Sequence, residues 1–255
     1  MSRLPELHPH HPRPAGPMVM RQRWADLLFL HWSLAPEVIQ RTLPPGLAVD
    51  VFQNKAWLGV VPFFMTAVRP ACLPAVPWLS SFLELNVRTY VRDASGRPGV
   101  WFYSLDCNRW PAVELARRGF HLSYQHATMQ AWRQSDGTIQ YQCQRRLPAT
   151  AGKPAVPAVY RYRGSGEIFL ASPGTLEFFL AERYRLFSWN GRRRQLYTGE
   201  VWHHPYPLQL ADVSGWSASP VVWNGDFSLE GPPMTQHYST GVNVGIFPLR
   251  KVQLS

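Results

Sequence analysis

A stripe of polar residues that can do chemistry lies between Phe82 and Tyr90. Glu84, Asn86 and Arg88 occupy alternate positions of a segment typical of a β-strand, and alternate positions of a strand share one face. A carboxyl group can act as a general acid or base, and a guanidinium group can hold an anion by paired hydrogen bonds. Two interpretations stay open, a solvated face with a cross-strand ion pair and the wall of a ligand cavity.

A second polar group belongs to a predicted hairpin around Asp136-Gly137. A two-residue loop there would oppose Trp132 with Tyr141 and Gln130 with Cys143. The residues that would share the inward face with these aromatic rings are Tyr124, His126, Thr128 and Gln130. Buried polar groups are costly unless they are hydrogen-bonded or line a cavity. We therefore expect Tyr124 and His126 to supply hydrogen bonds or proton transfer, and Gln130 to contact a ligand.

Most familiar catalytic motifs are missing from the sequence. Gly164-Ser165-Gly166 opens like a dinucleotide loop, but Phe169 stands where the third glycine belongs. There is no phosphate loop, no nucleophile-elbow serine and no His-Glu-x-x-His segment. The histidines are scattered, so a metal site would have to be assembled from distant segments. We expect neither a metal nor another cofactor.

The three cysteines, Cys72, Cys107 and Cys143, have neither a paired framework nor metal-ligand spacing. We expect three buried thiols.

Composition excludes several classes of protein. The 255 residues are 45% hydrophobic, which is enough for a large core and excludes intrinsic disorder. The net charge of +10 comes from dispersed arginines, and the one run, 192–194, is typical of a solvated turn, which disfavours a nucleic-acid partner. The apolar stretch from Trp57 to Val68 is too short to span a bilayer. The N-terminus lacks the apolar segment of a signal peptide, so we expect a cytoplasmic protein, with a homo-oligomer left open.

The pattern of turns predicts an α+β fold that is predominantly antiparallel β, with about three helices. The chain has 18 glycines and 24 prolines, and no linker or repeat divides it. We expect a flexible Pro/His-rich arm over residues 1–18 and a single domain over residues 19–255. The expected hairpins join 47–52 to 56–68, 82–92 to 100–107, and 126–133 to 138–145. The expected helices cover 36–43, 111–118 and 173–184, the last with Ser172 as its N-cap.

Several segments in succession resemble the YqjF-like family of bacterial proteins. They are Phe82-Leu-Glu-Leu-Asn-Val-Arg-Thr-Tyr-Val91, Gly99-Val-Trp-Phe-Tyr-Ser-Leu-Asp106, Ala56-Trp-Leu-Gly-Val-Val-Pro-Phe63, Leu176-Glu-Phe-Phe-Leu-Ala-Glu-Arg-Tyr184 and His204-Pro-Tyr-Pro-Leu-Gln209. This family looks like a branch of the acetoacetate decarboxylase-like superfamily, and the resemblance implies a β-rich barrel around a central cavity. It also implies that Glu84 lies on a strand where the decarboxylases place a pocket glutamate. The segment comparable to their lysine pair runs from Arg117 to His126 and holds no lysine, so their Schiff-base chemistry does not carry over.

These features predict a protein that binds a small anionic or carbonyl-bearing molecule in a central cavity. Arg88 and Asn86, with Gln130, would bind the ligand, and Glu84, Tyr124 and His126 would carry any acid–base catalysis. The alternatives are a noncatalytic ligand sensor or storage protein and an RNA-binding module that uses a basic surface.

Overall fold

The computed structural model describes residues 11–74, 80–109, 120–146, 156–225 and 227–253. Its strands are β1 (Met20–Leu34), β2 (Leu47–Val49), β3 (Ala56–Pro70), β4 (Phe82–Asp93), β5 (Pro98–Cys107), β6 (Tyr124–Arg133), β7 (Ile139–Arg145), β8 (Ala158–Phe169), β9 (Arg185–Asn190), β10 (Gln195–Trp202), β11 (Leu208–Gly215), β12 (Thr235–Ile246) and β13 (Arg250–Lys251). Its helices are α1 (Pro36–Gln40), α3 (Leu176–Ala181) and α4 (Ser219–Val222). The expected helix over 111–118 lies outside the described residues.

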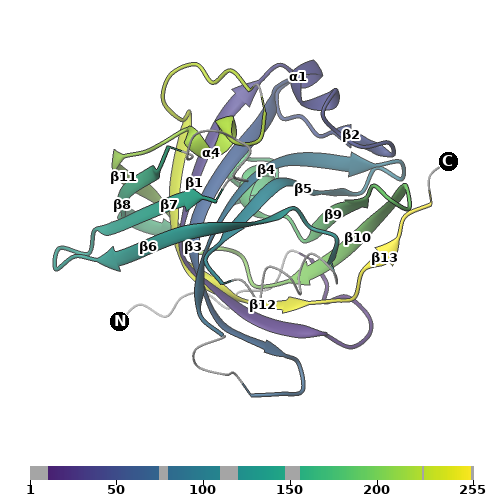
Figure 1. The fold of residues 1–255 in the computed structure, drawn as a ribbon, viewed down its shortest axis with the longest axis horizontal. Coiled ribbons are helices and arrows are strands. Elements are labelled where there is room, and N and C mark those ends of the chain that lie inside the picture. The colour runs from purple at the N-terminus through teal and green to yellow at the C-terminus, as the bar shows by residue number, and fades with distance from the viewer. Residues whose placement is uncertain (1–10, 75–79, 110–119, 147–155, 226, 254–255) are drawn as a thin grey trace.

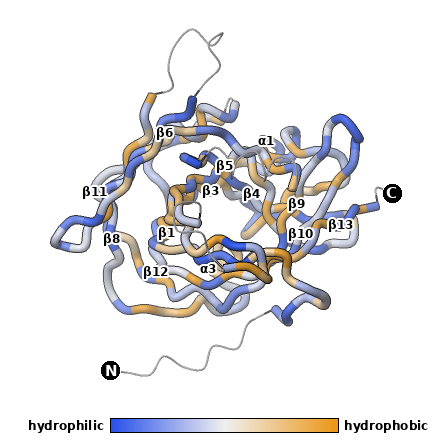
Figure 2. Tube along the Cα trace, turned by 60° about the horizontal axis from the view of Figure 1, so that its bottom comes forward, coloured by the Kyte–Doolittle hydropathy of each residue, from blue (hydrophilic) through white to orange (hydrophobic). Residues whose placement is uncertain are grey.

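The strands form one 13-stranded sheet that closes on itself twice. The smaller ring runs β4-β5-β9-β10-β12-β1-β3 and is closed by the pairings of β5 with β9 and of β10 with β12. The larger ring leaves β5 through β6, β7, β8 and β11 and returns to β12. Figure 2 shows β1, β3, β4 and β5 in the middle, between β6, β8 and β11 on one side and β9, β10 and β13 on the other. The fold is therefore a β-rich, mostly antiparallel one in which two rings share a wall (Figure 1).

The two faces of the shared wall have different surroundings, the core of the larger ring on one side and the interior of the smaller ring on the other. On β4, Leu83, Leu85 and Val87 pack into the core of the larger ring, which includes Tyr141 and Tyr160. The alternate residues of β4 point into the smaller ring. The larger ring is thus filled with side chains, and β4 is buried on both faces.

A buried ion pair fixes the larger ring where it meets β5. Arg145 of β7 donates to both carboxylate oxygens of Asp106 at 2.7 Å, and to Ser104. It also donates to the carbonyl of Trp223, just after α4. The pair ties β5, β7 and α4 together inside the core.

Two hairpins differ from the expected ones. Around Asp136-Gly137 the loop has three residues, because Gln134 pairs with Thr138 and Gly137 adopts φ +82°. This shifts the register by one, so Trp132 faces Gln140 instead of Tyr141. The segment 47–52 also pairs differently, because β2 joins β4 while β3 is already paired with β1 and β4.

The helix expected over 173–184 is shorter. Gly174 has φ +89°, which is incompatible with a helix, and Thr175 is the N-cap that accepts from the backbone N–H of Phe178. At the other end, Glu182 leaves helical geometry and accepts from the backbone N–H of Tyr206.

The structure describes all three cysteines and the end of the N-terminal segment, residues 11–18. Cys107 and Cys143 are buried as expected, whereas Cys72 is exposed. In the described part of the arm, His11 stacks against Tyr184 with ring centroids 5.3 Å apart. None of the helices in the described segments has the length and hydrophobicity to cross a bilayer.

We predict that Arg145→Met destabilises the fold by about 3–5 kcal/mol, because it leaves the buried Asp106 carboxylate without its cation. The double variant Arg145→Met/Asp106→Leu should recover part of this loss. Urea unfolding measures the free energy of unfolding of the single and the double variant. Arg163→Met is the control, because its ion pair with Asp212 is exposed and should contribute less than about 1 kcal/mol. Equal effects of the two single variants would show that the buried pair does not stabilise the ring.

Candidate functional site

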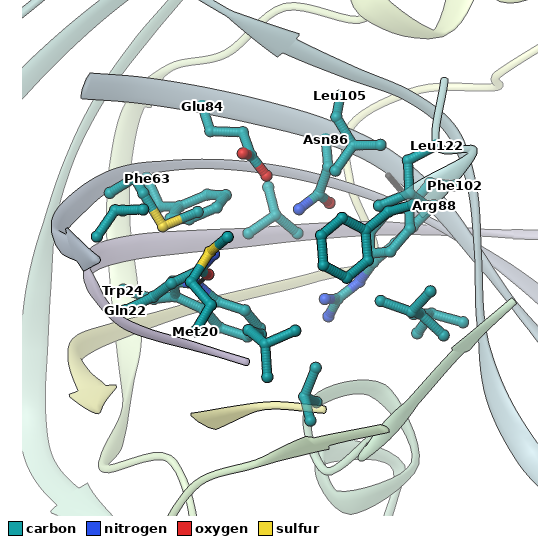
Figure 3. A pocket seen from close by; sticks show the side chains of 18 of the residues that line it. Met20, Gln22, Trp24, Phe63, Glu84, Asn86, Arg88, Phe102, Leu105 and Leu122 are labelled. Atoms are coloured by element: carbon teal, nitrogen blue, oxygen red, sulfur yellow. Dashed lines mark hydrogen bonds between the residues drawn. The ribbon is translucent and has the colours of Figure 1, made fainter. Parts of the chain in front are cut away.

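The smaller ring encloses a cavity of about 360 Å³. Each of its seven strands contributes lining residues, and so do β6 and the end of α3. Most of the lining is aromatic or aliphatic, and a few polar side chains lie among these residues (Figure 3). This combination is typical of small-molecule sites.

The polar stripe of β4 supplies the cavity's central functional groups. Glu84, Asn86 and Arg88 are buried and line the cavity, and Figure 3 shows them side by side along one strand. They point inward because the other face of β4 is taken by the core of the larger ring. The interpretation as a solvated outer face is therefore wrong, and the placement in a cavity is right.

Glu84 is a carboxyl group whose acidity is strongly perturbed. Burial raises the pKa of Glu84, the hydrogen bond from Tyr124 lowers it and the nearby charge of Asp106 raises it, so that the resulting pKa is about 8. The Tyr124 hydroxyl donates to Glu84 Oε2 at 3.0 Å. At neutral pH most of the Glu84 carboxyl is consequently protonated, and it can both donate and accept hydrogen bonds.

Arg88 is a buried cation that faces the cavity. Its Nη2 donates to the carbonyl of Leu180 at 3.0 Å, and its guanidinium lies 5.5 Å from the ring centre of Phe29. Within the described segments, no carboxylate forms an ion pair with it and its Nε has no hydrogen-bond partner. A buried guanidinium without a counter-ion favours the binding of an anion.

A hydrogen-bonded group behind Arg88 keeps its surroundings neutral. His31 Nε2 lies 2.7 Å from the Tyr90 hydroxyl, which donates to the same Leu180 carbonyl. Burial and the Arg88 charge hold the pKa of His31 well below its usual value, so the imidazole carries no charge. Gly59 allows this packing, because a Cβ there would lie 3.0 Å from the His31 ring.

Three further arginines line the cavity, Arg69, Arg183 and Arg185. Arg183 pairs with Asp50 at 2.8 Å, a carboxylate that it shares with Arg92, and Arg185 pairs with Glu200 at 2.9 Å. Arg183 and Arg185 therefore have carboxylate partners, unlike Arg88. Sequence reasoning assigned neither of them to the site: Asp50 is 133 residues from Arg183, and Arg185 faces Glu200 across the β9–β10 hairpin.

The other residues predicted for the site divide into two groups. Tyr124 lines the cavity, because it lies at the start of β6, which pairs with the end of β5. At this point the face of β6 that points away from the filled ring points into the smaller ring. Further along β6, the same face meets solvent, and Gln130 is exposed. His126 is partly buried but does not line the cavity. The inward positions expected for His126 and Gln130 are wrong, because they relied on the two-residue loop.

Tyr206 was also missed by sequence reasoning. It is buried, lines the cavity and contacts Phe29 edge-on with ring centres 5.4 Å apart. It lies in the segment His204–Gln209 that carried the family resemblance, so that signal was available. Among the described residues, no group of three or more histidine, cysteine or acidic side chains could hold a metal ion.

The family of the chain follows from comparison with known sequences. The DUF2071 family, described as "Uncharacterized conserved protein", matches residues 21–243. The chain belongs to this family. It is 35% identical over 238 residues to the uncharacterized protein YqjF of Bacillus subtilis (strain 168), covering 93% of this chain and 94% of that protein.

Solved structures show the same fold at low identity. An acetoacetate decarboxylase-like enzyme from Sphingomonas wittichii RW1 matches with TM-score 0.59 and 13% identity, covering 97% of this chain and 99% of that one. The enduracididine biosynthesis enzyme MppR, complexed with pyruvate, matches with TM-score 0.60 and 12% identity, covering 94% and 92%. The fold of the chain is therefore the acetoacetate decarboxylase-like one.

We predict that Glu84→Gln changes the pH dependence of stability. Between pH 4.5 and about 8 the folded carboxyl keeps a proton that the unfolded chain has lost, so wild-type stability falls as pH rises through this window. Glutamine cannot ionise, so Glu84→Gln should be more stable than wild type by about 2–5 kcal/mol at the alkaline end and gain little at the acid end.

Urea unfolding across that pH window measures the difference between variant and wild type. Glu167→Gln, an exposed carboxyl on β8, is the control and should give a flat difference. A flat difference for Glu84→Gln as well would show that the pKa of Glu84 is ordinary.

We also predict that no lysine forms a Schiff base with a β-keto acid. No lysine is among the described residues that line the cavity, Lys55 and Lys251 are exposed, and Lys153 lies outside the described residues. A Schiff-base lysine needs an amine that is removed from water or placed beside another cation inside a pocket, and neither exposed lysine has such surroundings. Incubation with acetoacetate and borohydride, followed by peptide mass mapping, should find no stoichiometric adduct. A reduced adduct on a single lysine would restore decarboxylase-type chemistry.

Proposed function

We propose that the protein binds a small anionic or carbonyl-bearing molecule in the cavity of the smaller ring. The observation that carries the proposal is the buried Arg88 guanidinium, which faces the cavity without a carboxylate partner in the described part of the chain. A ligand carboxylate would supply the missing charge. The pyruvate complex of MppR, which has the same fold, supports a ligand of this class.

We further propose that Glu84 and Tyr124 transfer a proton to or from the bound molecule. A general acid or base works best when its pKa is near the working pH, and the pKa of Glu84 is about 8. Because Tyr124 donates to Oε2, the proton of the neutral carboxyl can be donated from Oε1 to a carbonyl oxygen of the ligand. After donation, the Tyr124 hydroxyl stabilises the carboxylate that remains.

Asn86 adds a neutral polar contact between these two groups. Its Oδ1 is buried and has no hydrogen-bond partner among the described residues. An unpartnered acceptor inside a cavity costs free energy unless a ligand donor reaches it. We therefore assign Asn86 to ligand binding.

Arg88→Met tests the binding role. The variant should lose about 1.5–3 kcal/mol of carboxylate affinity, the contribution of a charge-assisted hydrogen bond. The unliganded variant should melt at a higher temperature than wild type, because it no longer buries an uncompensated charge. Thermal melting with pyruvate and levulinate at constant ionic strength measures both effects. Arg163→Met is the surface control, and an unchanged ligand response in Arg88→Met would refute anion binding at Arg88.

Proton exchange at carbon tests the catalytic role. In D2O, the protein should speed the exchange of hydrogens next to the carbonyl of an oxo acid, followed by proton NMR. Glu84→Gln should lower the exchange rate by about 10²–10⁴. Tyr124→Phe should lower it less. Binding without exchange for every oxo acid would leave a ligand sensor or storage protein.

A further inference from the structure

The cavity has a long axis that follows the shared wall. The pairings place Met65 beside Phe82, Phe63 beside Glu84, and Gly59 beside Arg88. Four residues, or about 13 Å of strand, therefore separate Glu84 from Arg88 along this axis. The groups that can contact a ligand are spread over a length, rather than gathered at one point.

The two ends of this axis differ in exposure. The outer end is formed by Met20, Arg69 and Pro70, where β1 pairs with the last residues of β3, and these side chains are partly or fully exposed. The inner end is formed by Arg88 and Tyr206, which are both buried. The uncompensated charge thus lies at the deep end of the cavity.

The stretch between the two ends is apolar apart from Gln22 on β1 and a few groups on β4 and β6. Its walls include Trp24 from β1, Phe63 and Met65 from β3, Phe82 from β4 and Phe102 from β5. Figure 3 shows Phe63 near Glu84, Trp24 beside Gln22, and Phe102 near Arg88. Such a wall binds hydrocarbon by removing it from water.

We propose that the ligand is an elongated monocarboxylate, held with its carboxylate at Arg88 and its apolar body directed along the cavity toward Arg69 and Pro70. This inference rests on the proposed anion-binding role of Arg88 and specifies the class of ligand. A single negative charge at the deep end fits because Arg183 and Arg185 already have carboxylate partners, Asp50 (shared with Arg92) and Glu200. Of the described arginines that line the cavity away from its outer end, Arg88 is the one without a carboxylate partner.

The carboxylate of such a ligand and the group that reaches Glu84 lie at different positions along the cavity. An acid gripped at Arg88 that also reaches Glu84 and Tyr124 must extend along the strand between them. The backbone spacing of about 13 Å favours a ligand longer than pyruvate for contact with both groups at once. An oxo group that reacts at Glu84 would therefore lie several carbons away from the carboxylate.

A series of straight-chain carboxylates tests the inference, with isothermal titration at constant salt and below the micelle concentration. From propanoate upward, affinity for the wild type should rise by about fourfold per methylene, the ratio that corresponds to about 0.8 kcal/mol of apolar burial. The rise should stop when the chain fills the cavity. The matched primary alcohols should show the same slope with lower affinity.

Two arginine variants test the orientation. Arg88→Met should lower the affinity of every acid by at least tenfold and leave the alcohols unchanged. Arg69→Met, at the outer end of the same cavity, should change the affinity of the acids by less than about threefold. A large loss in Arg69→Met with none in Arg88→Met would overturn the orientation.

A third variant tests whether the hydrocarbon chain of the ligand passes Met65. Met65→Trp narrows the cavity beside Phe82 and should shorten the preferred chain by several carbons while short acids bind as before. Circular dichroism and thermal melting establish that the variant folds.

The outcomes separate the two proposals. If acids bind through Arg88 but short and long chains bind equally, the elongated ligand is refuted and anion binding stands. If no acid binds, or if Arg88→Met has no effect, the proposed function itself fails.

Discussion

The burial of β1, β3 and β4 on both faces is the constraint on which the rest of this structure depends. These strands separate a filled ring from a hollow one, so neither face of their central residues meets bulk water. A polar side chain on such a strand must find a partner within the protein or point into the cavity. The polar residues of β4 point into the cavity, and the polar groups that the cavity contains follow from this placement.

Both ionisable groups of the stripe are buried. Loss of water disfavours the charged form of Glu84, which keeps its proton at neutral pH. The Arg88 guanidinium faces the cavity without a carboxylate partner among the described residues. A neutral acid and a guanidinium without a counter-ion therefore lie on one strand in the same apolar surroundings.

Much of this fold is readable from the sequence, and the parts that are not share a physical origin. Alternation along β4 predicted which residues share a face, because the period of a strand is local. The register around Asp136-Gly137 depends on a single residue in the loop, and one extra residue moved His126 and Gln130 away from the interior. Ring closure by β10 and β12, and the pairing of Arg183 with a distant carboxylate, join segments that carry no local signal for each other.

Because the wall has residues on both faces, a residue that affects the pKa of Glu84 can lie on the face opposite the cavity. Asp106 lies on β5 in the filled ring, bonded to Arg145, yet its charge acts across the wall on the acidity of Glu84. Substitutions around that ion pair can therefore alter the protonation of the cavity acid without altering the shape of the space that a ligand occupies. The acidity of Glu84 and the shape of the hollow ring are therefore set by residues on opposite faces of one wall, so each can diverge in evolution without the other.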